Sequence, residues 1–387
     1  MNDPAAPPAP ADRGRELRAL ALLFLRLGTT AFGGPAAHIA MMEDEVVRRR
    51  GWLSHASFLD MISACNLIPG PNSTEMAIHI GHRRAGLVGL AVAGACFVVP
   101  AALITAALAW AYVAFGAMPQ MAGVLYGIKP VIIAVVVQAI WRLARSALQT
   151  RFLIALTVAA TIAAFAGVDE MVILFAAGLI AIVISRFRES QAGASATGAL
   201  VTASKVAATT AMPFSLSGLF LIFLKIGAVL FGSGYVLLAF MQADLVDRTH
   251  WLTQAQLLDA VAIGQITPGP VLSTATFVGY LLGGKAGAVL ATVGIFLPAF
   301  VFVSISGPLL PRLRRSPIAG AFLDGVNAGS FALMVAVTWQ LGRAAVVDAT
   351  TAALVLISAI MLLRFRLNSA WLIVMGGAVG ALAAAFR

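Results

Sequence analysis

Long apolar stretches alternate with short polar segments along the chain. About six apolar segments precede a polar stretch at 190–213 and about six follow it, each near the length of a membrane-spanning helix. They are 17–48, 55–82, 86–115, 121–145, 151–166 and 168–186, then 215–247, 254–283, 285–310, 317–343, 348–364 and 369–386. The pattern predicts an all-α polytopic membrane protein. We divide it into a disordered tail (1–16), a first repeat (17–189), a cytoplasmic linker (190–213) and a second repeat (214–387).

Composition supports a membrane protein and excludes several classes of function. Hydrophobic residues make up 60% of the 387 residues and charged residues 11%, whereas a soluble domain carries about a quarter charged residues. The net charge is +10, but the arginines lie at segment ends, as expected for cytoplasmic loops and not for a nucleic-acid surface. Cys65 and Cys96 lack metal-ligand spacing, and no GxxxxGK[ST] loop is present. We therefore expect no metal, no cofactor, no nucleic acid and no enzyme activity.

The two halves repeat one sequence, and over a long opening stretch they align without a gap. FLRLGTTAFGG (Phe24 to Gly34) corresponds to FLKIGAVLFGS (Phe223 to Ser233), and Pro69 corresponds to Pro268. Each of these pairs is separated by 199 residues. A register that holds through glycine and proline, and not only through apolar residues, predicts two copies of one structural unit.

Loop charges indicate that the second copy is inverted. Basic loops stand after the fourth segment of the first half, but after the third and fifth segments of the second half. If such loops stay in the cytoplasm, the copies cross the membrane in opposite directions. Inversion needs an odd number of crossings, so we interpret the Pro-Gly-Pro segment of each half, 55–82 and 254–283, as a re-entrant or broken hairpin. This leaves about five spanning helices in each inverted repeat.

Each half carries helix breaks that could bind an anion. Proline ends or kinks a helix, and paired breaks at matching positions of two halves point to a transporter's binding site. Helix N-termini created by such breaks attract oxyanions. The predicted breaks are Pro69, Gly70 and Pro71, with Pro268, Gly269 and Pro270 in the second half, and Gly33, Gly34 and Pro35. Asn66, Asn72, Ser73, Thr74 and Gln265 are candidate donors to the anion, with helix capping as the alternative for Ser73 and Thr74.

Three cations lie inside apolar segments. Arg26 and its repeat partner Lys225 are candidate anion ligands, and extension of these side chains to the membrane interface is the alternative. Lys129 is a third candidate, and pairing with Tyr126 or a carboxylate is its alternative. Asp324 could carry a proton or neutralise a lysine.

Other titratable residues gather around the breaks of the first half. Glu45, Glu75 and His79 are candidates for proton coupling, and His38 is a candidate substrate ligand with a titratable ring. For Glu75, helix capping is an equal alternative. The run from Glu43 to Arg50 is most simply a solvated, salt-bridged helix end.

Several motifs together resemble the chromate transporter family in its long-chain, two-domain form. They are FGGPAAHIAMMEDEVVRRRGWLS, NLIPGPNSTEMAIHIGHRRAG, GIKPVIIAV, FGSGYVLLAF, GQITPGPVLSTATFVGY and LDGVNAGSFALMV, and they cover nearly all of both halves. The residues that match the family pattern are Gly33, Gly34, Pro35, His38, Glu45, Trp52, Asn66, Pro69, Gly70, Pro71, Asn72, Ser73, Thr74, Glu75 and Lys129. In the second half Gln265 replaces Asn66 and Thr274 replaces Glu75.

The resemblance implies a multi-pass protein of the cytoplasmic membrane that exports chromate and confers chromate resistance. Sulfate is the structural analogue of the substrate. We expect a secondary transporter driven by membrane potential or proton antiport, in contact with membrane lipid. Assembly into a homodimer is an open alternative. The alternatives are an importer of sulfate or another oxyanion with the same fold, an anion channel, and a chromate-reducing enzyme.

Overall fold

A computed structural model describes residues 10–115, 119–190, 213–232, 234–314, 316–365, 367 and 369–385, and no strand occurs among them. The first half contains α1 (Pro10–Thr30), α2 (Gly34–Glu43), the π-helical turn η1 (Asp44–Arg49), α3 (His55–Cys65), α4 (Asn72–Phe115), α5 (Pro119–Ala147), α6 (Arg151–Phe165) and α7 (Glu170–Ser190). The second half contains α8 (Leu216–Val229), η2 (Gly234–Val236), α9 (Leu237–Met241), η3 (Gln242–Arg248), α10 (Gln254–Ile266), η4 (Val271–Ser273), α11 (Thr274–Arg314), α12 (Pro317–Ala345), α13 (Ala349–Arg364) and α14 (Ser369–Ala385).

The two halves repeat each other down to backbone detail. A π-helical turn follows the first break in both halves, as η1 and η3. Both α4 and α11 are kinked, at Gly86 with φ of 61° and at Gly284 with φ of 60°. The prediction of an all-helical chain built from two repeats is confirmed. The predicted segment boundaries at 82–86 and 283–285 are confirmed, because the backbone is non-helical there and the helical parts on either side fold back on each other. A Cβ atom on Gly81 would meet the carbonyl oxygen of Gly89, and a Cβ atom on Gly279 would meet that of Gly287.

One predicted boundary is wrong. The tail was expected to extend to residue 16, but α1 already begins at Pro10. Residues 10–16 are therefore helical. The remainder of the predicted tail, 1–9, and most of the predicted linker, 191–212, lie outside the described residues.

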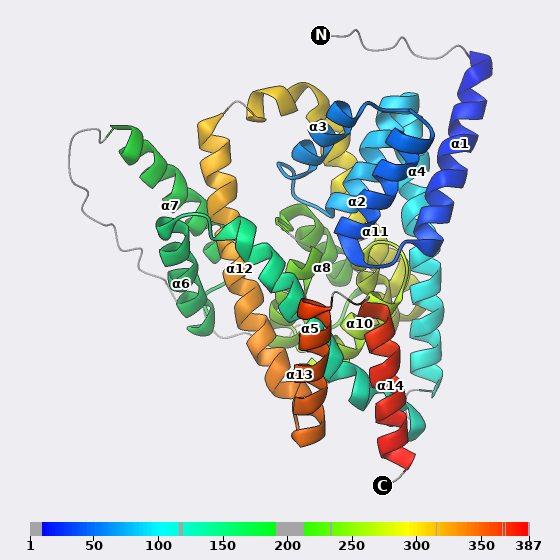
Figure 1. Ribbon diagram of the computed structural model, residues 1–387, viewed down its shortest axis with the longest axis vertical. Helices are drawn as coiled ribbons and strands as arrows, with labels where there is room; N and C mark the ends of the chain where they lie inside the picture. The colour runs from blue at the N-terminus through cyan, green and yellow to red at the C-terminus, as the bar shows by residue number, and fades with distance from the viewer. Residues whose placement is uncertain are drawn as a thin grey trace.

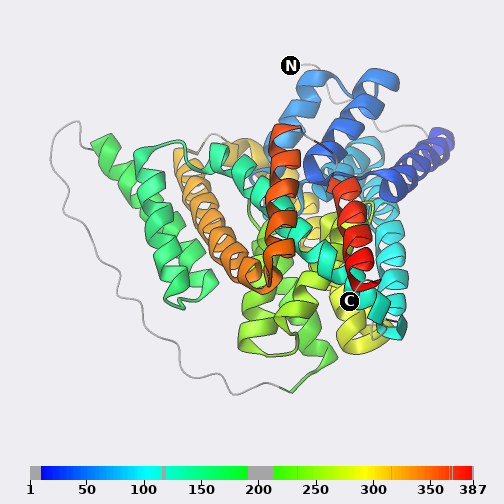
Figure 2. The same cartoon turned by 60° about the horizontal axis from the view of Figure 1, so that its bottom comes forward.

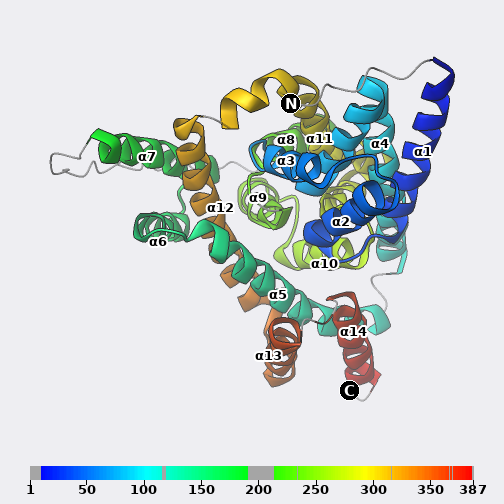
Figure 3. The same cartoon turned by 45° about the horizontal axis from the view of Figure 1, so that its top comes forward.

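The halves exchange their last two helices. In Figure 1, α13 and α14 of the second half lie beside α5 of the first half, whereas α6 and α7 lie beside α12. Figures 2 and 3 show the same pairing from two other sides. The remaining long helices, α1 with α4 and α8 with α11, pack together around the contact between α4 and α11. Each half is thus completed by the other.

Glycines allow the exchanged helices to approach closely. A Cβ atom on Gly127 of α5 would meet the carbonyl oxygen of Gly376 in α14. At the equivalent place, a Cβ atom on Gly325 of α12 would meet the carbonyl oxygen of Ala177 in α7. Small residues at helix contacts are typical of membrane proteins, in which association depends on close van der Waals packing.

The chain has the apolar helices of a multi-pass membrane protein. Among the described residues, the helical stretches long and apolar enough to cross a membrane are Asn72–Phe115, Met121–Arg145, Glu170–Phe187, Val271–Ser306 and Pro317–Ala345. Shorter apolar helices are Arg151–Phe165, Leu216–Val229, Ala349–Arg364 and Ser369–Ala385.

Candidate functional site

Four interruptions of helical structure meet in the centre of the fold. The amide of Gly70 donates a hydrogen bond to the carbonyl oxygen of Leu230 at 2.7 Å, and the amide of Gly269 donates to the carbonyl oxygen of Ala31 at 2.8 Å. Ala31 and Leu230 end the first helix of each half, and both glycines belong to the Pro-Gly-Pro segments. Reciprocal contacts between equivalent residues are the mark of a two-fold relation between the halves. Each Pro-Gly-Pro segment is therefore held by the opposite half.

The backbone of these interruptions requires glycine. The φ angle is +147° at Gly70, +88° at Gly269, +102° at Gly33 and +87° at Gly232. Residues with a side chain rarely adopt such angles, because their Cβ atom collides with the backbone. Proline on both sides of Gly70 and of Gly269 prevents a helix from passing through. Ser233, the neighbour of Gly232, lies outside the described residues.

Helix α2 begins at the first break with free amide groups. Its N-cap is Gly33, which provides no side chain to accept a hydrogen bond, and Pro35 lies in the first turn after Gly34. His38 is buried, and its Nε2 lies 3.1 Å from the carbonyl oxygen of Ala31, the same oxygen that accepts from Gly269. The break is therefore fixed from both halves while the helix N-terminus stays uncapped by a side chain.

The polar side chains around the Pro-Gly-Pro segments hold one another. Asn72 Nδ2 donates to Asn66 Oδ1 at 2.8 Å, which ties the two ends of the first segment together. In the second half, Tyr235 donates to Gln265 Oε1 at 3.2 Å. A Cβ atom on Gly34 would lie 3.8 Å from the Tyr235 hydroxyl. Tyr235 was not selected from the sequence, because its counterpart is Ala36 and the register gave no signal for it.

Buried polar atoms without hydrogen-bond partners follow both Pro-Gly-Pro segments. Thr74 Oγ1 and Ser273 Oγ occupy equivalent positions, 199 residues apart, and neither has a partner among the described residues. Both carboxylate oxygens of Glu75 and the Nε2 of His79 are likewise without a partner there. Ser73 is also buried. Unpartnered buried polar groups are uncommon in folded proteins, so these atoms are candidate ligand contacts.

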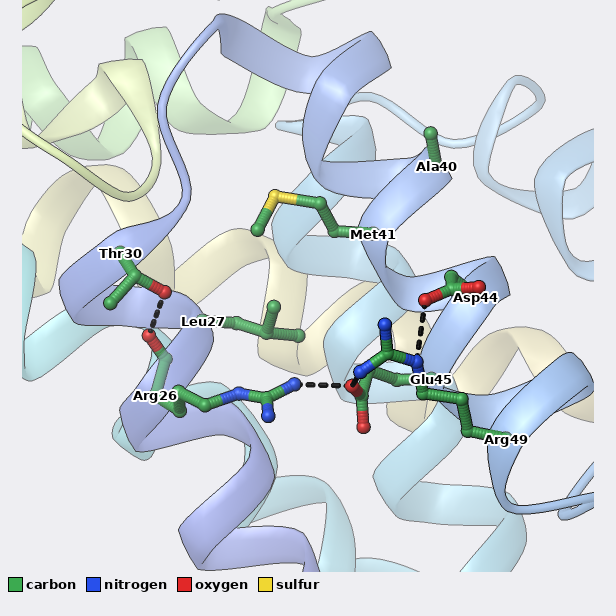
Figure 4. A pocket seen from close by; sticks show the side chains of 8 residues that line it. All are labelled: Arg26, Leu27, Thr30, Ala40, Met41, Asp44, Glu45 and Arg49. Atoms are coloured by element: carbon green, nitrogen blue, oxygen red, sulfur yellow. Dashed lines mark hydrogen bonds and ion pairs between the residues drawn. The ribbon is translucent and has the colours of Figure 1, made fainter.

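A cluster of ion pairs occurs once in each half. In the first half, Arg26 pairs with Glu45, and Arg49 and Arg50 reach the same carboxylate at 3.1 and 3.3 Å. Arg26, Glu45 and Arg49 of this cluster line a pocket of about 500 Å³. Figure 4 shows them with the other lining residues, Leu27, Thr30, Ala40, Met41 and Asp44. Burial acts to raise the pKa of Glu45, but hydrogen bonds and charge from the surrounding guanidinium groups hold it below its usual value. The cluster therefore stays charged at neutral pH, and Glu45 is not the solvated residue that the sequence suggested.

The equivalent cluster of the second half connects the two halves. Lys225 Nζ lies 2.5 Å from Asp244, which also binds Arg248. Arg248 reaches Asp169, in the connection between α6 and α7 of the exchanged pair, at 2.6 Å. Sequence reasoning found Lys225 but missed Asp244 and Arg248. The register could have shown them, since they stand 199 residues after Glu45 and Arg49.

Lys129 is also paired with a carboxylate. Its Nζ lies 3.0 Å from Asp259 Oδ1, and Tyr112 donates to Asp259 Oδ2 at 2.8 Å. This is the alternative left open for Lys129, with Asp259 of α10 as its partner in place of Asp324. Asp324 is exposed on α12. The pair joins the first half to the second.

Comparisons with known proteins agree on one family. The sequence model described as chromate transporter matches residues 18–182 and 217–381, one match in each half. A chromate transport protein of Cupriavidus metallidurans is 34% identical over 372 residues, which cover 94% of this chain and 92% of that protein. A chromate transport protein of Pseudomonas aeruginosa is 35% identical over 332 residues, covering 83% of this chain and 80% of that protein. A probable chromate transport protein of Synechococcus elongatus is 31% identical and covers 87% of each chain. No solved structure matches.

These matches confirm the resemblance seen in the motifs. The paired matches coincide with the two structural repeats, and the similarity to relatives extends over nearly their whole length. This chain belongs to the chromate transporter family.

Proposed function

We propose that the protein is a secondary transporter that exports chromate across the cytoplasmic membrane and so confers chromate resistance. The observation that carries the proposal is the pair of reciprocal hydrogen bonds from Gly70 to Leu230 and from Gly269 to Ala31. These bonds hold four helix interruptions together where the two halves meet. Secondary transporters built from repeats bind their substrate between interrupted helices of this kind. The choice of chromate as the substrate follows from two relatives named as chromate transport proteins and one named as a probable chromate transport protein.

In this proposal the anion binds between the helix N-termini that follow the breaks. The amides of α2 after Gly33 have no side-chain cap, and an N-terminus of this kind favours a negative ligand. Thr74 and Ser273 would add one hydroxyl from each half. A tetrahedral dianion such as chromate offers four oxygen acceptors to these donors, and sulfate has the same shape and charge.

The three membrane cations enter the proposal as exchangeable groups. Arg26, Lys129 and Lys225 each hold a carboxylate in this structure. An arriving dianion would bind such a cation by replacing its carboxylate partner. Their role is therefore one of attraction along the path, whereas the uncapped amides hold the anion at the centre.

We further propose inverted repeats that expose this centre alternately to the two sides. The exchange of basic loops between the halves supports the inversion. The clusters also differ in exposure: the Arg26 side chain is 52% exposed and that of Lys225 is 31% exposed. The same holds for Arg49 at 64% and Arg248 at 36%. Unequal access to equivalent residues is expected when one side is open and the other closed.

Export is the direction that the membrane potential favours. Each charge that crosses about 100 mV changes the free energy by about 2.3 kcal/mol. A dianion leaving a cell that is negative inside therefore gains about twice that value, whereas import must overcome it with co-transported cations. Export can run on the potential alone or with proton antiport.

Transport of labelled chromate and sulfate in oriented membrane vesicles tests the proposal. Inside-out vesicles from cells that produce the protein should accumulate chromate, and right-side-out vesicles should not. Accumulation only in right-side-out vesicles would instead indicate an importer. Saturable counterflow exchange is expected of a transporter, whereas single-channel currents in a planar bilayer would indicate an anion channel.

A further inference from the structure

Glu75 is a carboxylic acid that the proposed site does not use and that the fold encloses completely. Its relative exposure is 0%, and neither carboxylate oxygen has a hydrogen-bond partner among the described residues. It stands in the first turn of α4, directly after the first Pro-Gly-Pro segment. Its position is therefore coupled to the conformation of that segment.

The carboxylate lies against the break and against the opposite half. A Cβ atom on Gly70 would overlap Oε1 of Glu75, and the same atom would lie 3.7 Å from the Cβ of Ala299 in α11. Gly70 is the residue whose amide binds Leu230 of the second half. Any movement that separates Gly70 from the second half would also open the surroundings of Glu75.

The other buried carboxylates of the protein show what Glu75 lacks. Glu45, Asp244 and Asp259 each have at least one Lys or Arg partner. An ionised carboxylate is expensive to bury without such a partner, whereas its protonated form is not. Glu75 is therefore neutral in this conformation and would ionise when water reaches it.

Within the described ranges, no Lys or Arg forms an ion pair or hydrogen bond with Glu75. His79 stands one turn later on the same face of α4. His38 of α2 is bound to the carbonyl of Ala31, and α11 presents Ala299. The charge state of Glu75 thus depends chiefly on its access to water.

The second half has no equivalent acid. Thr274 occupies the position of Glu75, and its hydroxyl donates to the carbonyl oxygen of Val271 at 2.8 Å. The repeat is therefore asymmetric where a proton could be carried. One acid in one half corresponds to one proton in each transport cycle.

We propose that Glu75 carries the coupling proton of transport. It holds the proton while Gly70 is bound to Leu230, and it releases the proton to water when the first Pro-Gly-Pro segment separates from the second half. The O–H bond of the carboxyl group breaks and water accepts the proton, so no other reactant is needed. The proposal rests on the proposed function, which it extends by naming the coupling ion and its carrier.

Reconstituted protein in liposomes tests this with Glu75→Gln, which fixes the neutral form. With the potential clamped to zero and the lumen one pH unit more acidic, wild type should accumulate chromate about tenfold through one-for-one proton exchange. Glu75→Gln should lose this accumulation and the accompanying proton flux. It should still exchange labelled for unlabelled chromate. Asp60→Asn makes the same change at an exposed carboxylate of α3 and should behave like wild type.

The outcomes separate the two proposals. Full accumulation by Glu75→Gln under the pH gradient would overturn the role of Glu75, and so would wild-type transport that responds to potential but not to the pH gradient. Absence of any chromate flux in wild type would instead overturn the proposed function. If Glu75→Gln fails to reach the membrane, Glu75→Asp replaces it as the test. That variant keeps a titratable acid and should shift the pH dependence of accumulation, and an unchanged pH dependence would count against the proposal.

Discussion

Removing the positive charge of Lys129 should lower the free energy of unfolding. Removing the negative charge of its partner Asp259 as well should recover part of that loss. Lys129 Nζ and Asp259 Oδ1 are 3.0 Å apart, with side chains 22% and 5% exposed. At this separation and an effective dielectric constant of about 20, the attraction is about 5 kcal/mol. Breaking a buried pair by removing one partner costs about 3–5 kcal/mol, because the other charge is left buried. Lys129→Met should lose stability in this range, since only Tyr112 would still bind the carboxylate.

A double-mutant cycle separates this pairing from anion binding. Asp259→Asn keeps an oxygen for Tyr112 and removes the buried charge. Lys129→Met with Asp259→Asn should therefore recover about 1–3 kcal/mol relative to the sum of the single changes. Stability is measured by thermal unfolding in detergent, and chromate exchange is measured in liposomes. Wild-type stability of Lys129→Met would refute the reasoning. A stable double mutant without exchange, beside an active Asp259→Asn variant, would show that Lys129 also contacts the anion.

Three further outcomes are expected. Gly70→Ala should reduce the amount of folded protein, because φ is +147° and a Cβ atom would overlap the Glu75 carboxylate; normal yield and unfolding temperature would contradict the observed backbone. Thr74→Val combined with Ser273→Ala should raise the KM for chromate by about tenfold, equal to about 1.4 kcal/mol, without loss of stability, because neither hydroxyl has a hydrogen-bond partner in the described part of the chain. A KM equal to that of wild type would show that neither hydroxyl binds chromate. Single cysteines at Gln149 and Val347, which are exposed and equivalent in the repeats, should react with an impermeant thiol reagent from opposite sides of the membrane, in a background without native cysteines. Labelling from one side would exclude inversion.

The sequence predicted the repeat and its interruptions because both are local properties. A constant spacing of 199 residues and the backbone limits of glycine and proline can be read without knowing what lies nearby. The partner of Lys129 could not be read in this way. Asp259 stands in the other half, 130 positions later, and only the packing of α10 against α5 brings it close.

Some features were available in the sequence and still missed. Asp244 and Arg248 follow from the same register that paired Arg26 with Lys225, once Glu45 and Arg49 are included. The turns within α4 and α11, by contrast, were predicted as the boundaries between the segments that end at 82 and 283 and those that begin at 86 and 285. In the structure the non-helical backbone of Ala85 and Gly86 makes this turn, and it brings Gly81 against Gly89 and Ala93.

The exchange of α6–α7 and α13–α14 has a consequence for biosynthesis. During translation α5 is complete long before the ribosome has made its covering helices, so its glycine face must first meet lipid. Final packing of the first half then waits for the last residues of the chain. Loss of α14 would expose Gly127, and a lesion at the very C-terminus would thereby damage the part of the protein that was synthesised first.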